Sequence, residues 1–284
     1  MWRAQQLIHS MNSIQYKSTL EDHIKAIKEV QKNIPFERNN IPLITQHEAK
    51  QAFTGGVVLG EGGQGIVHLG KLSDQTPVVI KRFESDNILS AVREYHAHMT
   101  FYQSIDKKCR EFFSTPLRMQ IPFEHGKSVY LAQRPLHNDG ESIVEFTGAN
   151  LHNLINTVDQ AIYLLFSIQN IIECMSDAAI TQDDIKEENV LIINRDYPVI
   201  RVIDFGLSTV NTSKVEYEEY ISEKFAKLVA RALSRSNATC LLMFKQALDE
   251  ISLDLFSSFL RVELNKRKKN ASRDQNQHGK KIKT

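Results

Sequence analysis

The sequence is poor in several features that define whole classes of protein. Only 3 of its 284 residues are cysteines, and Cys109, Cys174 and Cys240 are far apart. An odd number of widely spaced cysteines argues against a disulfide framework or a zinc site, so we expect core or half-exposed thiols in a reducing compartment. No apolar run approaches membrane-spanning length, and the first ten residues hold no apolar segment of a secretory signal. These absences favour a cytoplasmic protein.

A strong charge of either sign is also missing. The net charge is +1, and 42% of the residues are hydrophobic, which is enough for one large or two small packed lobes. The average conceals a basic tail, because residues 266–284 hold eight Lys or Arg against one acidic residue, Asp274. The tail is low in apolar residues, so we expect it to be disordered. It suits an acidic surface such as nucleic acid, anionic lipid or an acidic protein, or serves only to keep the chain soluble.

The first 52 residues are expected to be an extension outside the main domain. Ser18 and Glu21 have the spacing of a helix capping box. Apolar residues then recur at helical intervals and predict a helix over about 19–32. Its apolar stripe docks on the body of the protein or on a partner. Residues 33–52 are interpreted as a linker, because two prolines and two adjacent asparagines lie among them.

Glycine is scarce overall, yet four of the 12 glycines lie within six residues, between two apolar runs. Gly60, Gly62 and Gly65 fit the pattern Gly-x-Gly-x-x-Gly, and glycine there lets backbone N–H groups approach a phosphate closely. Dinucleotide-binding folds share the pattern, but they need a helix directly after it, whereas residues 66–69 continue as a strand. The pattern therefore predicts a glycine-rich hairpin whose backbone approaches phosphates, and its candidate binding residues are Gly60, Glu61, Gly62, Gly63, Gln64, Gly65 and Val67.

The next two segments each carry one charged residue of interest. The apolar run 78–81 ends in Lys81, which we expect to contact phosphates, although a lysine at the end of a strand is commonplace. Apolar residues at helical intervals over about 86–104 predict a helix that contains Glu94.

The rest of the chain is expected to be mainly helical. A strand is predicted at 129–132, and a buried helix at 159–177, where Phe166 and Cys174 are among apolar residues on most faces. Near the end of the chain two apolar stripes predict two more helices. One stripe is Ile221, Phe225, Leu228, Val229 and Ala232, and the other is Phe244, Leu248, Ile251, Leu255 and Phe259.

One stretch between these helices concentrates the chemistry. Asp184, Lys186 and Asn189 lie within six residues, and Asp204 follows two short apolar runs that predict the strands of a hairpin. Such a hairpin would bring Asn189 and Asp204 together at its open end, where two oxygen-bearing side chains suit a hard cation such as Mg²⁺. A general base, a phosphate-neutralising cation and a metal site are the parts that phosphoryl transfer needs.

The pattern Asp-x-Lys-x-x-Asn, followed by Asp-Phe-Gly, resembles the catalytic and metal-binding loops of protein kinases. The resemblance implies an α+β, two-lobed protein-kinase-like fold. A small β-rich N-lobe is expected over about 53–133 and a shortened, mainly helical C-lobe over about 139–265. ATP and Mg²⁺ are the implied cofactors.

The resemblance also implies a role for each candidate residue. Lys81, oriented by Glu94, would hold the phosphates of ATP, and Leu131 and Gln133 would line the adenine pocket, Leu131 as its gating residue. Asp184 would accept the proton of a substrate hydroxyl, while Lys186 neutralises the phosphoryl group in transfer. The metal would be held by Asn189 and Asp204.

Two departures from the family precede Asp184. Gln182 stands where the family has a histidine, and Asp183 where it has an arginine. Without that arginine a phosphate on an activation loop has no obvious partner, so we expect activity that does not depend on loop phosphorylation. No Ala-Pro-Glu and no long activation segment follow, so the platform on which ordinary kinases dock peptides is missing or replaced. The short C-lobe is similar to that of minimal kinases, among them bacterial effectors that are secreted into a host cell.

These patterns favour a Ser/Thr protein kinase with a protein substrate. A protein partner that holds so compact a kinase in its active form is a further expectation. Three alternatives stay open: a kinase-like enzyme that acts on a small molecule or lipid, a pseudokinase that serves as a binding module, and a nucleic-acid-binding protein, which the basic tail alone suggests.

Overall fold

The computed structural model describes residues 43–63, 65–84, 88–119, 128–135, 144–145, 148–178, 180–194, 196–210, 213–251 and 255–267. These residues fall into two compact units. Unit 1 contains the described residues up to 135 together with those of 177–184 and 201–210, and unit 2 contains the others. The helix expected over about 19–32 lies outside the described residues. No described helix is long and apolar enough to cross a membrane.

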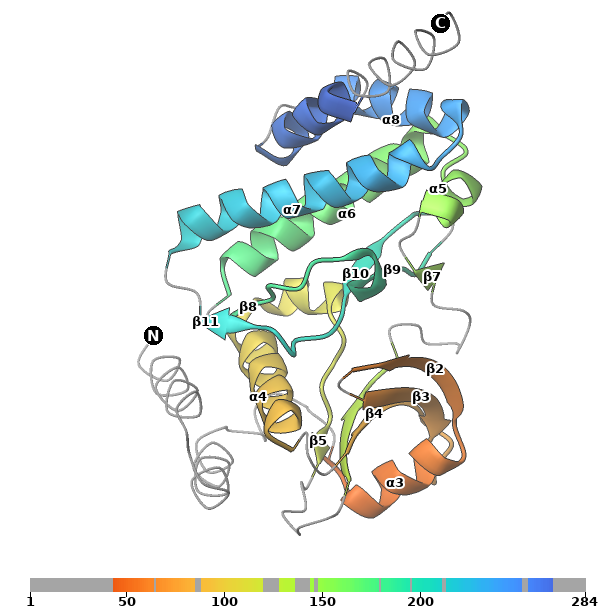
Figure 1. The fold of residues 1–284 in the computed structure, drawn as a ribbon, viewed down its shortest axis with the longest axis vertical. Helices are drawn as coiled ribbons and strands as arrows, with labels where there is room; N and C mark the ends of the chain where they lie inside the picture. The colour runs from red at the N-terminus through yellow and green to blue at the C-terminus, as the bar shows by residue number, and fades with distance from the viewer. Residues whose placement is uncertain are drawn as a thin grey trace, which may run out of the picture. The chain divides into compact units, whose positions relative to one another are not determined.

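A four-stranded antiparallel sheet with the order β2-β3-β4-β6 forms the centre of unit 1 (Figure 1). The residues of β4 that pack inside are Val78 and Ile80, both fully buried, and branched apolar residues favour a strand in such a place. Lys81 lies opposite Leu131 in the ladder. The strands are β2 (Val57–Gly62), β3 (Gly65–Lys71), β4 (Pro77–Phe83) and β6 (Val129–Gln133). The strands expected around the glycines and at 78–81 and 129–132 are confirmed.

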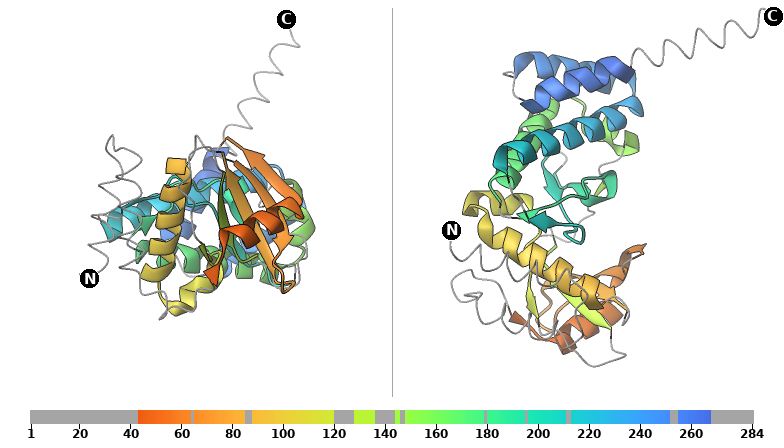
Figure 2. Two further views of the ribbon diagram at one scale, coloured as in Figure 1. Left: turned by 90° about the horizontal axis from the view of Figure 1, so that it is seen from below. Right: turned by 60° about the vertical axis from the view of Figure 1, so that its left-hand side comes forward.

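Helix α3 (Gln46–Thr54) packs on this sheet against β3, β4 and β6 (Figure 2). Thr45 caps it: the Thr45 hydroxyl accepts a hydrogen bond from the backbone N–H of Glu48 at 3.2 Å, and the Glu48 carboxylate accepts one from the backbone N–H of Thr45 at 2.8 Å. Just before it, β1 (Leu43–Ile44) pairs in parallel with β5 (Arg118–Met119). The interpretation of 33–52 as a linker is therefore wrong from residue 43 onward, where apolar residues join the core.

Two glycines permit the close approach of α3 to the sheet. A Cβ atom at Gly70 would lie 2.0 Å from the carbonyl oxygen of Ala52, and one at Gly56 would lie 2.9 Å from the same atom. Both distances are too short for a side chain, so these positions need glycine because of packing, and not because of an unusual backbone conformation.

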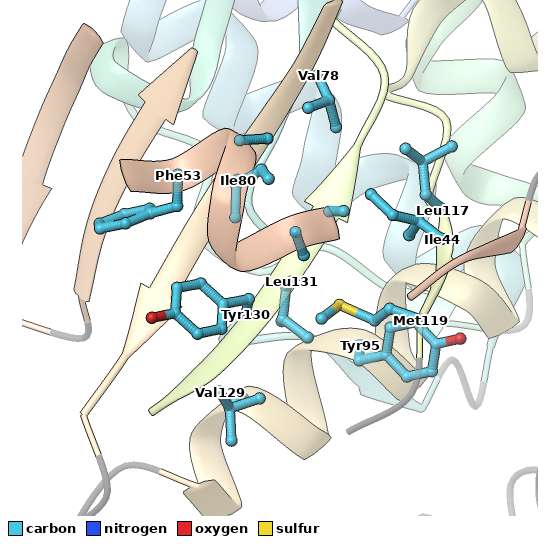
Figure 3. Close-up of a cluster of buried hydrophobic side chains, with 14 of the residues drawn as sticks. Ile44, Phe53, Val78, Ile80, Tyr95, Leu117, Met119, Val129, Tyr130 and Leu131 are labelled. Carbon is cyan, nitrogen blue, oxygen red and sulfur yellow. The ribbon is translucent and has the colours of Figure 1, made fainter. Parts of the chain in front are cut away.

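A single hydrophobic cluster joins these elements (Figure 3). Helix α4 (Ile88–Ser104) contributes Ala91, Tyr95 and Met99 to it. The sheet, α3 and the β1–β5 pair supply most of the rest, including Ile44, Phe53, Val78, Ile80, Met119, Val129, Tyr130 and Leu131. Unit 1 also contains a 3₁₀ helix, η3 (Lys107–Phe112), and a short antiparallel pair, β8 (Ile180–Thr181) with β11 (Thr209–Val210).

Unit 2 is mainly helical. Figures 1 and 2 show the long helix α6 (Val158–Ser176) running beside α7 (Lys214–Ser234). Helix α8 (Ala238–Glu250) also packs on α6, and α5 (Gly148–Leu154) packs on α7. A small sheet has the order β10-β9-β7, with β7 (Val144–Glu145), β9 (Val190–Ile192) and β10 (Ile200–Val202), whose last two residues belong to unit 1. The hairpin expected after Asn189 is confirmed.

Two expectations for the helices of unit 2 need correction. Helix α6 is buried over much of its surface but not on every face, because Phe166 is 50% and Tyr163 47% exposed. The second C-terminal stripe does not belong to one helix: α8 ends at Glu250, and residues 255–267 form a separate helix in which Leu255 is exposed and Phe256 buried. This last helix also extends two residues into the segment expected to be a disordered tail, of which the remainder lies outside the described residues.

All three cysteines were expected to be free thiols, and this is confirmed for one of them. Cys240 is free and buried, whereas Cys109 and Cys174 are disulfide-bonded. The cysteines therefore give no support to a reducing compartment.

The close packing at Gly70 predicts the effect of a single methyl group. We expect Gly70→Ala to lower the free energy of unfolding by about 1–3 kcal/mol, since the new methyl forces α3 away from β3. Gly55→Ala is the matched control, because a Cβ there meets only an ordinary contact at 3.6 Å. Urea unfolding measures both, and an equal loss in the two variants would contradict the packing explanation.

His96, on α4, predicts a pH dependence of stability. Its side chain is buried, both ring nitrogens lack a hydrogen-bond partner among the described residues, and burial lowers its pKa from 6.5 to about 4. Between those pH values the unfolded chain takes up a proton that the folded chain does not, so stability falls as the pH falls. We expect His96→Leu to reduce the loss of unfolding free energy between pH 7 and 5 by about 2 kcal/mol. An unchanged loss in His96→Leu, measured by urea unfolding at the two pH values, would contradict this explanation.

Candidate active site

An ion pair between a strand and a helix is the first element of the candidate site. Lys81 Nζ on β4 lies 2.6 Å from Glu94 Oε2 on α4, and the two side chains are only 15% and 12% exposed. Burial raises the pKa of the Glu94 carboxyl to about 7, because lost hydration outweighs the attraction of the Lys81 ammonium. Burial alone would lower the pKa of Lys81, but the carboxylates of Glu94 and Asp204 raise it above its usual value. Lys81 is therefore a firmly held cation, and the predicted pair with Glu94 is present.

Asp204 approaches the same ammonium group from another segment of unit 1. Its Oδ2 atom lies 3.5 Å from Lys81 Nζ, and its Oδ1 atom accepts a hydrogen bond from the backbone N–H of Gly206 at 3.0 Å. The backbone of Asp204 has φ 63°, in the left-handed region that costs a non-glycine residue about 1 kcal/mol. Contacts elsewhere must hold this conformation in place.

Gln182 supplies those contacts. Its fully buried side-chain amide donates hydrogen bonds to the carbonyl oxygens of Asp204 at 2.6 Å and of Ile203 at 3.1 Å. The amide oxygen of Gln182 accepts a hydrogen bond from the backbone N–H of Asp184 at 3.0 Å. One side chain thus fixes the backbone at both Asp184 and Asp204. In the sequence Gln182 was visible only as a departure from the family, and its two-sided role was missed.

Phe205 anchors the next residue of the same segment. Its ring is buried and stacks on His98 at 4.6 Å between ring centroids, with Phe101 at 4.8 Å. Burial lowers the pKa of His98 to about 4, so the ring is neutral and donates from Nε2 to the carbonyl oxygen of Ser114 at 2.7 Å. The Ser114 hydroxyl in turn donates to Gln133 Oε1 at 3.1 Å. Sequence patterns gave no signal for His98 or Ser114, because their contacts lie far apart along the chain.

The glycine-rich hairpin has room for a ligand on its backbone. In the β2–β3 ladder Gly60 lies opposite Val67, Glu61 opposite Ile66 and Gly62 opposite Gly65. A Cβ atom at Gly60, Gly62 or Gly63 would meet nothing within 4 Å, whereas at Gly65 it would strike the carbonyl oxygen of Arg82. Gly65 is therefore required by the fold itself. The open backbone at the other three glycines fits the close approach of phosphate groups, and Gln64 lies outside the described residues.

Leu131 and Gln133 lie on β6, as predicted. Leu131 is buried in the core cluster of unit 1 and lies opposite Lys81, and Gln133 is the last residue of the strand. Their contact with a nucleotide stays a prediction, and most of the segment expected as the hinge lies outside the described residues.

The remaining predicted residues belong to unit 2. Lys186 is exposed, and Asn189 is buried at the end of the 3₁₀ turn η4 (Glu187–Asn189), which its backbone N–H closes on the Lys186 carbonyl oxygen at 3.0 Å. In the described part of the chain, no group of three or more His, Cys, Asp or Glu side chains is arranged so that it could hold a metal ion. The shared cation of Asn189 and Asp204 therefore stays a prediction that rests on these two residues alone.

An unpredicted ion pair fixes η4 within unit 2. Glu187 Oε2 lies 2.7 Å from Arg235, just after α7, and Glu187 Oε1 lies 4.0 Å from Arg231 in the last turn of that helix. The Glu187 side chain is 13% exposed, so the pair is well shielded on the acidic side. Nothing local in the sequence signals it, because Glu187 and Arg235 are 48 residues apart.

Comparison with known proteins agrees with this geometry. A family model described as the protein kinase domain matches residues 53–226, more than half of the chain. The chain belongs to the protein kinase family. A search of curated proteins found no match to this kinase. The α+β, kinase-like fold is confirmed, and family membership supports a kinase-like phosphotransferase.

The Glu187 ion pair predicts a measurable coupling in this kinase. We expect the combined loss of unfolding free energy in Glu187→Gln with Arg235→Ala to be smaller than the sum of the single losses by about 1 kcal/mol. The exposed pair Glu223 and Lys227, on one face of α7, is the control, and its coupling should stay below about 0.5 kcal/mol. Chemical unfolding of the six variants measures both cycles. Additive losses at Glu187 and Arg235 would contradict a stabilising interaction between the two side chains.

Proposed function

We propose that this kinase transfers the γ-phosphoryl group of ATP to a serine or threonine hydroxyl of a protein, with Mg²⁺. The observation that carries the proposal is the ammonium group of Lys81, which is held between Glu94 and Asp204 at 2.6 and 3.5 Å. A buried cation with two carboxylates beside it is prepared for a ligand that brings both negative phosphates and a metal ion.

The described residues fit such a ligand. The open backbone of Gly60, Gly62 and Gly63 accepts phosphates without steric obstruction, and Lys81 offers three N–H donors. Carboxylate and amide oxygens are the donors that Mg²⁺ prefers, which assigns the metal to Asp204 and Asn189. When bound, Mg²⁺ would neutralise charge on the phosphates and so favour their transfer.

The protein groups then have separate tasks. Lys81 holds the phosphates, and Glu94 keeps the ammonium group aimed. Asp184, whose backbone is fixed by Gln182, accepts the proton of the attacking hydroxyl. Lys186 supplies positive charge for the group in transfer.

The type of acceptor is the most open part of the proposal. Helix α7 begins at Lys214, only a short distance along the chain from Gly206, which leaves little room for a peptide-docking segment. That observation favours, as a second candidate, transfer to a small hydroxyl compound. A protein partner that supplies the missing platform would reconcile the short segment with a protein substrate.

Transfer of labelled γ-phosphate from Mg²⁺-ATP tests the proposal. We expect label on serine or threonine of a protein acceptor, and a loss on the order of a thousandfold or more in Lys81→Ala and in Asp204→Ala. Arg82→Ala is the control, since Arg82 is the next residue of β4, faces away from Lys81 and pairs with the exposed Glu84. Chelation of Mg²⁺ should abolish transfer.

Two outcomes would change the conclusion. Label on small hydroxyl compounds alone would favour the second candidate. Absence of any transfer, both for the purified chain and after addition of a cell extract as a source of an activating partner, would contradict phosphotransfer and favour a binding module.

A further inference from the structure

A cluster of two hydroxyls and a carboxylate ties together the segments that precede Asp184 and follow Asp204. Strands β8 and β11 pair over only two residues, Thr209 with Thr181 and Val210 with Ile180. Side chains reinforce this short ladder. The Thr181 hydroxyl lies 3.0 Å from Asp183 Oδ2 and 2.8 Å from the Thr209 hydroxyl, and the Thr209 hydroxyl donates a hydrogen bond to the same Asp183 oxygen.

The three side chains of this cluster differ in their exposure to solvent. Thr181 is buried and Asp183 is half-buried, whereas Thr209 is exposed. The Asp183 carboxylate is therefore partly shielded from water, whereas Thr209, which donates a hydrogen bond to it from β11, is an exposed residue. A modifying enzyme can approach a residue that is exposed in this way.

The position of the cluster connects it to the candidate active site. Asp183 is adjacent to Asp184, and Thr209 lies five residues after Asp204. Gln182, the residue before Asp183, holds the strained backbone of Asp204. A change that separates β11 from β8 would thus act on both carboxylates of the site within unit 1.

A negative charge on Thr209 is a change that would separate β11 from β8. A phosphoryl group on Thr209 would add a charge of about −1.5 to −2 and remove the donated proton. Both consequences weaken the contact between Thr209 and Asp183. The Asp183 carboxylate loses the hydrogen bond that it accepts, and it repels the added negative charge. The kinases that this chain resembles have an arginine in the place of Asp183, which would attract the same phosphate.

We propose that Thr209 is a modification site at which a phosphoryl group switches this kinase off, with Asp183 as the group that senses the charge. The proposal rests on the proposed function, since it concerns the regulation of that site. In the modification the bond between the γ-phosphorus of ATP and its bridging oxygen breaks and a bond to Thr209 Oγ1 forms. ADP leaves, and the hydroxyl proton passes to solvent.

A charge cycle tests the sensing role. Thr209→Glu places a carboxylate beside Asp183, and Thr209→Gln has the same size but keeps a donor. We expect kcat to be about thirtyfold lower for Thr209→Glu than for Thr209→Gln when Asp183 is present. In the Asp183→Asn background the ratio should shrink to about threefold or less, because the repulsion is gone. An equal ratio in both backgrounds would overturn the electrostatic switch.

Hydrogen exchange provides a readout that does not depend on turnover. The backbone amides of β8 and β11 should exchange faster in Thr209→Glu than in Thr209→Gln, and this difference should disappear in the Asp183→Asn background. If the exchange difference occurs in a chain without kinase activity, the proposed function fails while the sensing role of Asp183 stands. If exchange is the same in all variants, the sensing role of Asp183 is overturned.

The modification itself is tested by mass spectrometry. We expect phosphate on Thr209 after incubation of the full chain with Mg²⁺-ATP and cell extract, and lower activity of the phosphorylated fraction. Phosphate on other residues only, or undiminished activity of the Thr209-phosphorylated fraction, would overturn the assignment of a modification site.

Discussion

The ammonium group of Lys81 is the centre on which the candidate site depends. It lies between two carboxylates, and water is largely excluded from Lys81 and Glu94, whereas Asp204 is partly exposed. Such a group is stable only if its geometry is well defined, because an uncompensated buried charge is costly. The sheet register places Lys81, the packing of α4 places Glu94, and the segment after β10 places Asp204. The packing of unit 1 therefore fixes the position of the Lys81 ammonium group and of the two carboxylates beside it.

The second constraint is the left-handed backbone of Asp204. Residues in sparsely populated conformations persist only where surrounding contacts determine them. Here the contacts come from a glutamine amide, which donates to two carbonyl oxygens and accepts from one N–H at the same time. A neutral histidine has one donor and one acceptor, so Gln182 satisfies one more backbone group than the residue it replaces. An amide also does not titrate in the physiological range, so this support is independent of pH.

Sequence patterns predicted the parts of the site that are local in the chain. The glycine-rich hairpin, the strand that ends near Lys81 and the helix with Glu94 each have a short periodic signal, and the structure contains all three. The contact of Gln182 with Asp204 and that of Glu187 with Arg235 had no such signal, because these partners are 22 and 48 residues apart. Helix α3 could have been found: Thr45 and Glu48 form a capping box, but neighbouring prolines and asparagines favoured the linker interpretation. Which face of α6 is exposed depends on its neighbours, and an apolar sequence alone does not determine it.

Two acidic residues beside the proposed catalytic groups make contacts within their own units: Asp183, which stands where the family has an arginine, and Glu187. Asp183 binds the hydroxyls of the segment that follows Asp204, and Glu187 binds the arginines at the end of α7. Each lies within one residue of a proposed catalytic group, Asp184 or Lys186. A kinase with a long activation segment needs an added charge to order it, since ordering many residues costs conformational entropy. A short segment has little entropy to lose, so a few hydrogen bonds within each unit suffice. Under the proposal for Thr209, an added phosphate would have no segment left to order, and its charge would repel the Asp183 carboxylate, which already binds the Thr209 hydroxyl.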